Sequence, residues 1–279
     1  MIDRRRGRPL AILLAAVSLA SSPLPAASID TVWIPSTAMK TTLVGLVVVP
    51  DTSQAPGGSF PVVYLLHGYG AHPKVWLQRL DLRSFADRYR CMIVCPDGSE
   101  DSWYLDSPVD TSSRYETYVA TEVVDWIDAH YPTVRTREGR AITGVSMGGH
   151  GSLYIAIRHQ GRFGAAGSIS GILDLLETTQ EAALARKLGE YGIHPSRWRE
   201  HSVVNHLEKL RGSSMALSIL CGTDDPFTLS NRRTHQDLLS LGVGHDYIEF
   251  PGGHSWEAWG RACEYQFLFF RDFFSRRGL

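Results

Sequence analysis

The chain of 279 residues has no long hydrophobic run, little cysteine and no excess of either charge. Its main apolar stretch, 10–20, is well short of the roughly 20 residues that a membrane-spanning helix needs. The four cysteines and eleven histidines show no Cys-x-x-Cys or His-x-x-x-His spacing, so a local metal site is not expected. The formal net charge is -1 with both signs scattered, which favours neither a nucleic acid nor an anionic membrane as partner.

The N-terminus has the three regions of a secretory signal peptide. Four arginines lie within the first eight residues, the apolar stretch 10–20 follows, and 21–27 is rich in serine, proline and alanine. We expect residues 1–27 to be removed by cleavage near Ala26 or Ala27, because the apolar stretch is too short for a membrane anchor. The first cysteine is Cys91, which leaves no attachment point for a lipid. The sequence therefore predicts a soluble protein that is secreted or periplasmic.

The rest of the chain, 28–279, contains no linker, repeat or low-complexity tract, so we expect one domain. Short apolar segments alternate with longer amphipathic ones, which predicts an α/β fold with a mostly parallel sheet. Several short segments lack the alternation of a sheet with one wet face, as expected for strands covered by helices on both faces. The predicted strands are 43–49, 61–66, 91–95, 140–143, 165–169, 216–221 and 247–250, and the predicted helices are 76–89, 114–130, 147–159 and 229–241.

Two segments of this pattern carry further predictions. Ser113 and Glu116 form a capping-box pattern at the start of the second predicted helix, and Pro132 lies just beyond its end. Farther along, 173–214 interrupts the alternation with extra helix-like pieces. We expect this segment to be an insertion over the functional site.

The four cysteines allow two interpretations. Disulfides are compatible with an exported protein, and Cys91, Cys95, Cys221 and Cys263 allow three pairings. Cys91 and Cys95 share one strand-like run and Cys221 ends another, which is at least as typical of buried free thiols. The sequence leaves both interpretations open.

The most informative motif is Gly144-Val-Ser-Met-Gly148. It is typical of a nucleophile elbow, a strand-to-helix turn in which glycines two residues before and after the serine avoid a clash with neighbouring backbone. The turn would lift the hydroxyl of Ser146 clear of the sheet. It would also place the amide of Met147 at a helix start, where unpaired N–H groups can hold a developing negative charge. The motif favours covalent acyl chemistry, which further needs a base, an acid and an oxyanion site.

Candidate partners follow three other predicted strands. Asp224 and Asp225 come after the sixth predicted strand, His254 after the seventh and His67 after the second. In doubly wound sheets the chemistry collects at the carboxyl ends of the strands. The order Ser, Asp, His is also the chain order of α/β hydrolases.

Each candidate also has a local interpretation. The two aspartates are suited to capping a helix that opens near Phe227, and His254 and His67 to satisfying turns. His150 is a rival base, but it lies one helical turn beyond the serine and is better suited to packing or to lining the site. The arrival of nucleophile, acid and base types at three strand ends favours a catalytic triad over these alternatives.

Five stretches extend the pattern beyond single residues: Tyr-Leu-Leu-His-Gly-Tyr-Gly at 64–70, Ala-Ile-Thr-Gly-Val-Ser-Met-Gly-Gly-His-Gly-Ser-Leu at 141–153, Phe-Gly-Ala-Ala-Gly-Ser-Ile-Ser-Gly at 163–171, Cys-Gly-Thr-Asp-Asp at 221–225 and Gly-Gly-His-Ser-Trp-Glu-Ala-Trp at 252–259. Together they resemble the esterase D family of α/β hydrolases. That family includes feruloyl and acetylxylan esterases of carbohydrate esterase family 1, tributyrin-type esterases, S-formylglutathione hydrolases and mycolyltransferases.

The resemblance implies an α/β-hydrolase fold and a role for each site residue. Ser146 would be the nucleophile, His254 the base and Asp225 the acid, with Asp224 as the alternative if the register is off by one. The backbone N–H groups of Tyr69 and Met147 would form the oxyanion hole, and no cofactor or metal is implied.

The resemblance also implies a small-molecule or carbohydrate ester as substrate. Hydrolysis is the leading interpretation, acyl transfer to a sugar alcohol is the alternative, and a non-catalytic binding module is disfavoured because no triad member is missing. S-formylglutathione hydrolysis belongs to the cytosol, which conflicts with an export signal.

Aromatic residues near the predicted site allow two interpretations each. Trp103 and Tyr104 follow the third predicted strand and either stack on a sugar or phenolic acyl group or pack their own loop. Trp256 and Trp259 are expected to anchor the last helix in the core. The sequence carries no signal for the oligomeric state.

Overall fold

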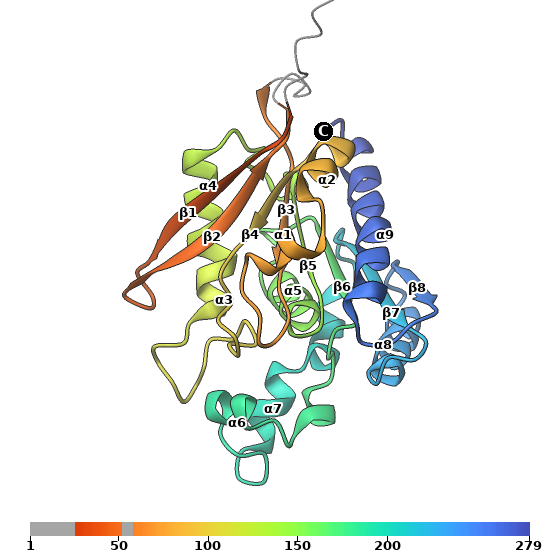
Figure 1. The fold of residues 1–279 in the computed structure, drawn as a ribbon. Coiled ribbons are helices and arrows are strands. Elements are labelled where there is room, and N and C mark those ends of the chain that lie inside the picture. The colour runs from red at the N-terminus through yellow and green to blue at the C-terminus, as the bar shows by residue number, and fades with distance from the viewer. Residues whose placement is uncertain (1–25, 52–57) are drawn as a thin grey trace, which may run out of the picture.

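A computed structural model describes residues 26–51 and 58–279 (Figure 1). One eight-stranded sheet, in the order β1-β2-β4-β3-β5-β6-β7-β8, runs through the molecule. The strands are β1 (Ser28–Ser36), β2 (Thr41–Val49), β3 (Val62–Leu66), β4 (Met92–Cys95), β5 (Arg140–Gly144), β6 (Ala165–Ile169), β7 (Ala216–Gly222) and β8 (Asp246–Phe250). β4, β3, β5, β6, β7 and β8 are parallel, whereas β1 and β2 form an antiparallel hairpin at one edge. The predicted α/β fold with a mostly parallel sheet is confirmed.

All seven predicted strands are present, and one strand was missed. β1 is an edge strand whose residues are mostly exposed at its beginning, and it pairs along its whole length with β2, from Ser28 opposite Val49 to Ser36 opposite Thr41. Its sequence, Ser-Ile-Asp-Thr-Val-Trp-Ile-Pro-Ser, is too polar to read as a buried strand. The pairing with β2, not its own hydrophobicity, accounts for its place in the sheet.

The helices are α1 (Val75–Arg79), α2 (Leu82–Tyr89), α3 (Tyr115–Thr117), the π-helical turn η3 (Tyr118–Val123), α4 (Val124–His130), α5 (Met147–Arg158), α6 (Ala182–Leu188), α7 (Pro195–His201), α8 (Thr228–Ser240) and α9 (Trp256–Ser275), with short 3-10 helices η4 (Arg137–Gly139), η5 (Leu175–Thr178) and η6 (Val203–Leu210). The helix predicted over 76–89 is two helices. Leu80 is extended between them, and the Asp81 side chain caps α2 by accepting from the Ser84 N–H at 3.2 Å.

The capping box predicted at Ser113 and Glu116 is wrong. The helical run begins at Tyr115 without a side-chain cap. Glu116 is 5% exposed, and its Oε1 accepts from Arg158 Nε at 2.7 Å. A buried carboxylate gains more from a charged partner than from a backbone cap at a helix end, which local sequence does not indicate.

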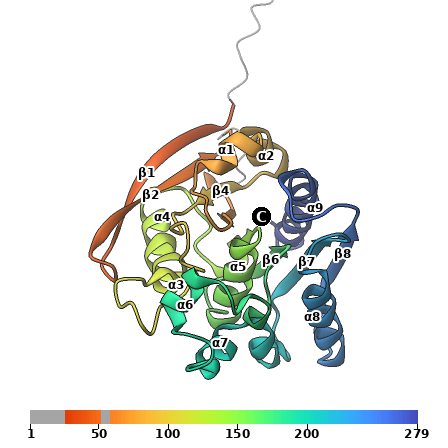
Figure 2. The ribbon, with the colours of Figure 1, turned by 60° about the horizontal axis from the view of Figure 1, so that its bottom comes forward.

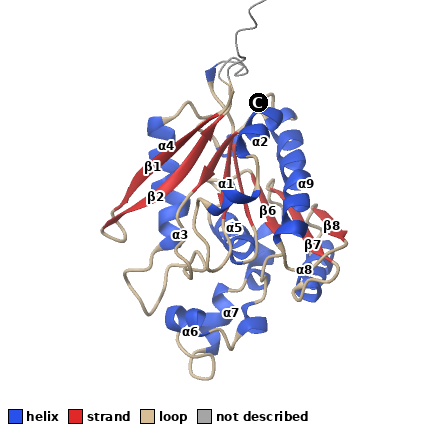
Figure 3. Cartoon of the chain, in the orientation of Figure 1, coloured by secondary structure: helices blue, strands red, loops and turns tan. Residues whose placement is uncertain are grey.

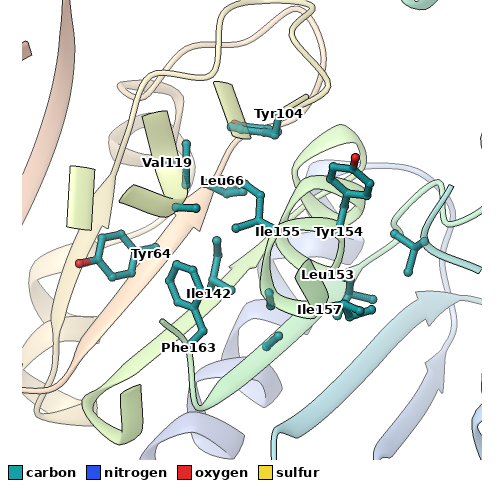
Figure 4. Packing of buried hydrophobic residues seen from close by; sticks show 14 of the residues in the cluster. Tyr64, Leu66, Tyr104, Val119, Ile142, Leu153, Tyr154, Ile155, Ile157 and Phe163 are labelled. Carbon is teal, nitrogen blue, oxygen red and sulfur yellow. The ribbon is translucent and has the colours of Figure 1, made fainter. Parts of the chain in front are cut away.

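Helices cover both faces of the sheet (Figure 2), which divides the hydrophobic core into two layers. Residues from η3, α4, α5 and α8 pack against one face, and residues from α2 and α9 against the other. Successive side chains of a strand point to opposite faces, so β3 supplies both layers. On the first face, the Tyr64 ring meets that of Phe163 edge to face with centroids 5.7 Å apart (Figure 4).

The segment 173–214 departs from the strand–helix alternation, as predicted. It forms η5, α6, α7 and η6, of which α6 and α7 lie beyond the carboxyl ends of the strands (Figure 3). α6 reaches the loop after β4, because Arg186 pairs with Asp101 at 2.9 Å and the backbone oxygen of Lys187 accepts from Ser107 Oγ at 2.6 Å. The insertion is therefore attached to the loops at the same edge of the sheet as the predicted triad.

Most of the predicted signal peptide, 1–25, lies outside the described residues. Within the described ranges, no helix is long and apolar enough to cross a membrane. Among the same residues, no cluster of three or more His, Cys, Asp or Glu side chains is arranged to hold a metal ion.

Candidate active site

Ser146 occupies a tight turn between β5 and α5. Its φ of 57° and ψ of -120° lie outside the regions that a non-glycine residue ordinarily adopts. A Cβ on Gly144 or Gly148 would collide with the carbonyl oxygen of Leu66 at the end of β3, so only glycine fits at either position. The turn predicted from the Gly-x-Ser-x-Gly pattern is present.

Hydrogen bonds from neighbouring backbone hold this strained turn. The N–H of Ser146 donates to the carbonyl of Ile169, at the end of β6, at 2.9 Å, and Val145 forms a bridge to the same residue. The Ser146 carbonyl in turn accepts from the N–H of His150 at 3.0 Å, as the first turn of α5 requires. The serine is thus placed by two strands and a helix.

The three predicted triad residues meet at the carboxyl edge of the sheet. His254 Nε2 lies 2.8 Å from Ser146 Oγ, and His254 Nδ1 lies 2.8 Å from Asp225 Oδ2. An ionised carboxylate only accepts, so Nδ1 carries the ring proton and Nε2 is left to accept from the serine hydroxyl. The His254 side chain is 25% exposed, whereas that of Asp225 is fully buried.

The two adjacent aspartates differ in exposure and in their contacts. Asp224 is exposed, whereas the side chain of Asp225 is buried and touches His254. The local interpretation of Asp225 also holds in part, because its Oδ1 accepts from the N–H of Phe227 at 2.9 Å. One carboxylate therefore serves the turn before α8 and the histidine together.

The loops that carry the aspartate and the histidine are joined through their backbones. The N–H of Thr223 donates to Phe250 O at 2.8 Å, and the N–H of Asp224 donates to Gly252 O at 3.0 Å. These bonds continue the pairing of β7 and β8 past the strand ends. They fix the separation between the acid and the base.

Two aromatic rings enclose the His254 imidazole. Phe227 and Trp259 meet it edge to face, with centroids 5.3 Å and 4.8 Å away. The packing of Trp259, which is 8% exposed, agrees with the prediction that this residue anchors the last helix. Its contact with His254 was missed, as was that of Phe227, because neither is visible without the fold.

The two predicted oxyanion donors belong to segments next to Ser146. Met147 is the first residue of α5, and an N–H there has no acceptor within its own helix. Tyr69 lies in the loop after β3, next to Gly68, where an added Cβ would stand 3.4 Å from Ser146 Cβ. Both backbones therefore approach the nucleophile, and the Tyr69 side chain is 50% exposed.

Trp103, Tyr104 and His150 pack in the interior instead of facing a substrate. Tyr104 and His150 have no exposed surface and Trp103 is 3% exposed. His150 Nε2 bonds the carbonyl of His201 at 2.9 Å, and burial lowers the pKa of His150 to about 4. The structure thus contradicts a substrate-facing role for these three residues, and it argues against His150 as the base, because the imidazole of His150 bonds the His201 carbonyl and the Ser146 hydroxyl bonds His254.

The four cysteines are free thiols and all are buried. Burial raises the pKa of the thiols of Cys221 and Cys263 to about 12. Of the two interpretations left open by the sequence, the structure supports free thiols.

Comparison with known proteins identifies relatives of this chain. The model of the family described as "Putative esterase" matches residues 36–267. The chain belongs to this esterase family. The match includes the turn at Ser146 and both loops that bring Asp225 and His254 to it, and the fold of this family member is that of the α/β hydrolases.

Three similar proteins set this family member in context. It is 29% identical over 235 residues to Esterase Rv1288 of Mycobacterium tuberculosis, which covers 75% of this chain and 51% of that protein, so the chain spans about half the length of that relative. It is 25% identical over 244 residues to the diacylglycerol acyltransferase/mycolyltransferase Ag85A of M. tuberculosis, covering 74% and 72%. A solved structure of a ferulic acid esterase superimposes with a TM-score of 0.76 at 26% identity, covering 89% of this chain and 99% of that one.

Proposed function

We propose that this esterase-family protein hydrolyses carboxylic esters through a triad of Ser146, His254 and Asp225. The observation that carries the proposal is the pair of 2.8 Å contacts that link the serine hydroxyl to the imidazole and the imidazole to the carboxylate. That arrangement supplies a nucleophile with a base in reach and a base with a fixed tautomer.

The reaction follows from these roles. Ser146 Oγ attacks the ester carbonyl while His254 Nε2 takes its proton, and the buried carboxylate of Asp225 stabilises the imidazolium that forms. His254 then gives the proton to the leaving alcohol, and an acyl-enzyme remains. Water attacks the acyl-enzyme with the same histidine as base, and the acid is released.

The negative charge on the carbonyl oxygen is assigned to the backbone N–H groups of Tyr69 and Met147. The free end of α5 and the close approach of the Tyr69 loop to Ser146 support this assignment. An oxyanion donor of this kind typically contributes about 3 to 4 kcal/mol to the transition state. Because both donors are backbone groups, replacing the Tyr69 side chain is expected to matter far less than replacing Ser146.

Replacing the nucleophile is the direct test. Ser146→Ala is expected to lower turnover of a p-nitrophenyl ester to below about one percent of wild type, because no other group can form the acyl-enzyme. Ser168→Ala is a matched control, since its hydroxyl is also buried but bonds no partner among the described residues. Both variants should keep the wild-type thermal midpoint. Activity retained in Ser146→Ala would refute the triad.

The substrates are proposed to be esters outside the cytosol, including acetylated or feruloylated carbohydrates. The predicted signal peptide and the similarity to a ferulic acid esterase support this class. A panel of methyl ferulate, acetylated xylan, tributyrin and short p-nitrophenyl esters tests it. The proposal predicts faster cleavage of the carbohydrate-type esters, and faster cleavage of simple acetate esters would refute it.

Acyl transfer to a sugar alcohol is the second candidate, favoured by the similarity to the mycolyltransferase Ag85A. The same acyl-enzyme can react with a bound alcohol instead of water. Running the panel with and without a sugar acceptor separates the two, because a hydrolase releases free acid in both cases and a transferase yields a new sugar ester.

A further inference from the structure

His67, at the end of β3, is held on two sides by hydrogen bonds. The side chain has no exposed surface, and its Nε2 lies 3.1 Å from the backbone nitrogen of Gly98. A backbone N–H can only donate, so Nε2 accepts and Nδ1 carries the ring proton. Nδ1 then donates to the carbonyl of Gly68 at 3.0 Å. The Gly98 amide therefore fixes the tautomer of His67.

The bond from Nδ1 orients the peptide group that joins Gly68 to Tyr69. No peptide bond among the described residues is cis, and in a planar trans peptide the C=O and N–H point in opposite directions. Holding the Gly68 oxygen on the His67 side therefore turns the Tyr69 N–H to the other side. This N–H is the proposed oxyanion donor.

Tyr104 supports His67 from the loop after β4. Its hydroxyl donates to the His67 carbonyl at 3.1 Å, and the two rings meet edge to face with centroids 5.9 Å apart. Tyr104 has a φ of 56°, which is unfavourable for a residue with a Cβ, so packing must hold it there. Gly151 of α5 leaves the space that its ring fills, because an added Cβ would lie 2.5 Å from the ring.

The same loop makes a third contact beyond Tyr69. The carbonyl of Glu100 accepts from the N–H of Gly70 at 2.8 Å. Gly98, Glu100 and Tyr104 thus contact the chain on both sides of the Tyr69 peptide. We call these three residues together with His67 the oxyanion-loop clamp.

We infer that His67 and Tyr104 are positioning residues of the oxyanion hole: His67 Nδ1 sets the direction of the Tyr69 amide, and Tyr104 holds His67. The inference rests on the proposed esterase function. Both side chains act through the backbone, which explains why they are buried and yet border the site.

Two substitutions of His67 separate its two hydrogen bonds. His67→Gln places an amide near the position of Nε2 and loses the donor to Gly68, whereas His67→Asn places an NH₂ near Nδ1 and keeps it. We expect His67→Gln to lower kcat about 10- to 100-fold with little change in KM, a part of the loss that follows removal of an oxyanion donor. His67→Asn is expected to stay within about 5-fold of wild type.

A second pair of variants applies if His67 substitutions disturb folding. Tyr104→Phe removes the hydroxyl that bonds His67 O, and Tyr64→Phe removes an equally buried hydroxyl that has no partner among the described residues. Tyr104→Phe should lower kcat about 3- to 10-fold, and Tyr64→Phe should leave it unchanged. If the Tyr104 hydroxyl had a purely structural role, Tyr104→Phe would lower the thermal midpoint without lowering kcat.

The affinity for a trifluoromethyl ketone gives a readout specific to the oxyanion. The ketone adds to Ser146 and places a negative oxygen where the ester oxyanion would lie. The inhibition constant should therefore rise by the same factor as kcat/KM falls in His67→Gln and Tyr104→Phe. The contacts of His254 with Ser146 and Asp225 are not altered by either substitution.

Labelling of Ser146 by an organophosphorus ester, followed by mass spectrometry, separates the two levels of the proposal. Failure of the wild type to form the adduct would overturn the proposed function and the clamp together. If the wild type is labelled, equal kcat for His67→Gln and His67→Asn, or for Tyr104→Phe and Tyr64→Phe, would overturn the clamp alone.

Discussion

At the scale of single residues, Asp225 divides its two carboxylate oxygens between two partners. Oδ1 accepts from the N–H of Phe227 and Oδ2 from His254, both in a place without solvent. Because both contacts need an acceptor, the residue must be a carboxylate. An amide has only one oxygen to offer.

This arrangement predicts a large effect of Asp225→Asn. The amide oxygen would face the N–H of Phe227, its NH₂ would face His254, and the imidazole would be forced into the tautomer that cannot accept from Ser146. We expect kcat to fall about 10³- to 10⁴-fold. Steady-state kinetics of Asp224→Asn provide the control, since Asp224 is exposed and should give near wild-type rates. Comparable losses in the two variants would contradict the assignment of the acid.

At the scale of elements, α5 connects the nucleophile to the insertion. Tyr154, two turns beyond Ser146, stacks on His150 and on His201 of α7, with centroids 5.5 Å and 5.8 Å away. His206 of η6 meets the same ring at 5.6 Å. Burial lowers the pKa of all three histidines, so they pack as neutral rings.

These neutral histidines make the stability of the protein depend on pH. Their pKa values are lower in the folded protein than in the unfolded chain, so the unfolded chain binds more protons as the pH falls. The free energy of unfolding therefore decreases below about pH 6.5 and is unaffected by these histidines above it. For His150 the loss runs from there down to about pH 4. This difference in the pKa of His150 lowers the free energy of unfolding at acid pH by at most about 3 kcal/mol.

Replacing His150 should flatten this dependence. His150→Gln keeps a donor for the His201 carbonyl but cannot titrate, so its free energy of unfolding should fall less steeply between pH 6.5 and 4 than that of wild type. Denaturant unfolding at a series of pH values measures the slope. His72→Gln, at an exposed position, is the control and should match the wild type. An unchanged slope in His150→Gln would show that its neutral form is not held by burial.

At the scale of the whole molecule, the buried interior contains all four thiols. Cys91, Cys95 and Cys263 belong to the layer beneath α2 and α9, and Cys221 is buried near the end of β7. Each is shielded from solvent and has its pKa raised by burial, so the thiolate that reacts is scarce.

Thiol titration checks this view of the core. Without reductant, an aromatic disulfide reagent should find almost no reactive thiol in the native protein and about four per chain after unfolding in guanidinium. Two or fewer thiols after unfolding would indicate disulfides. Rapid reaction of the native protein would show that the core opens.

Local sequence patterns were enough to predict much of the fold. The runs that became β3, β4, β5, β6 and β7 are buried on both faces, so their lack of alternation between apolar and polar residues is visible in the sequence. The polar edge strand β1 and the break at Leu80 could not be predicted from the sequence, because strand pairing and helix packing decide them. Glu116 illustrates the same limit, since its partner Arg158 is 42 residues away.

For the site, the sequence by itself determined the turn at Ser146 and the order of serine, aspartate and histidine, because steric crowding at a strand-to-helix turn admits few residue types. It also indicated that the partners follow strand ends, where parallel strands bring them together. Only the tertiary structure placed Asp225, and not Asp224, against His254, turned Tyr104 and His150 into the core, and aimed His67 at the Gly68 carbonyl. Those outcomes depend on side-chain direction and on contacts between distant loops, which no local pattern encodes.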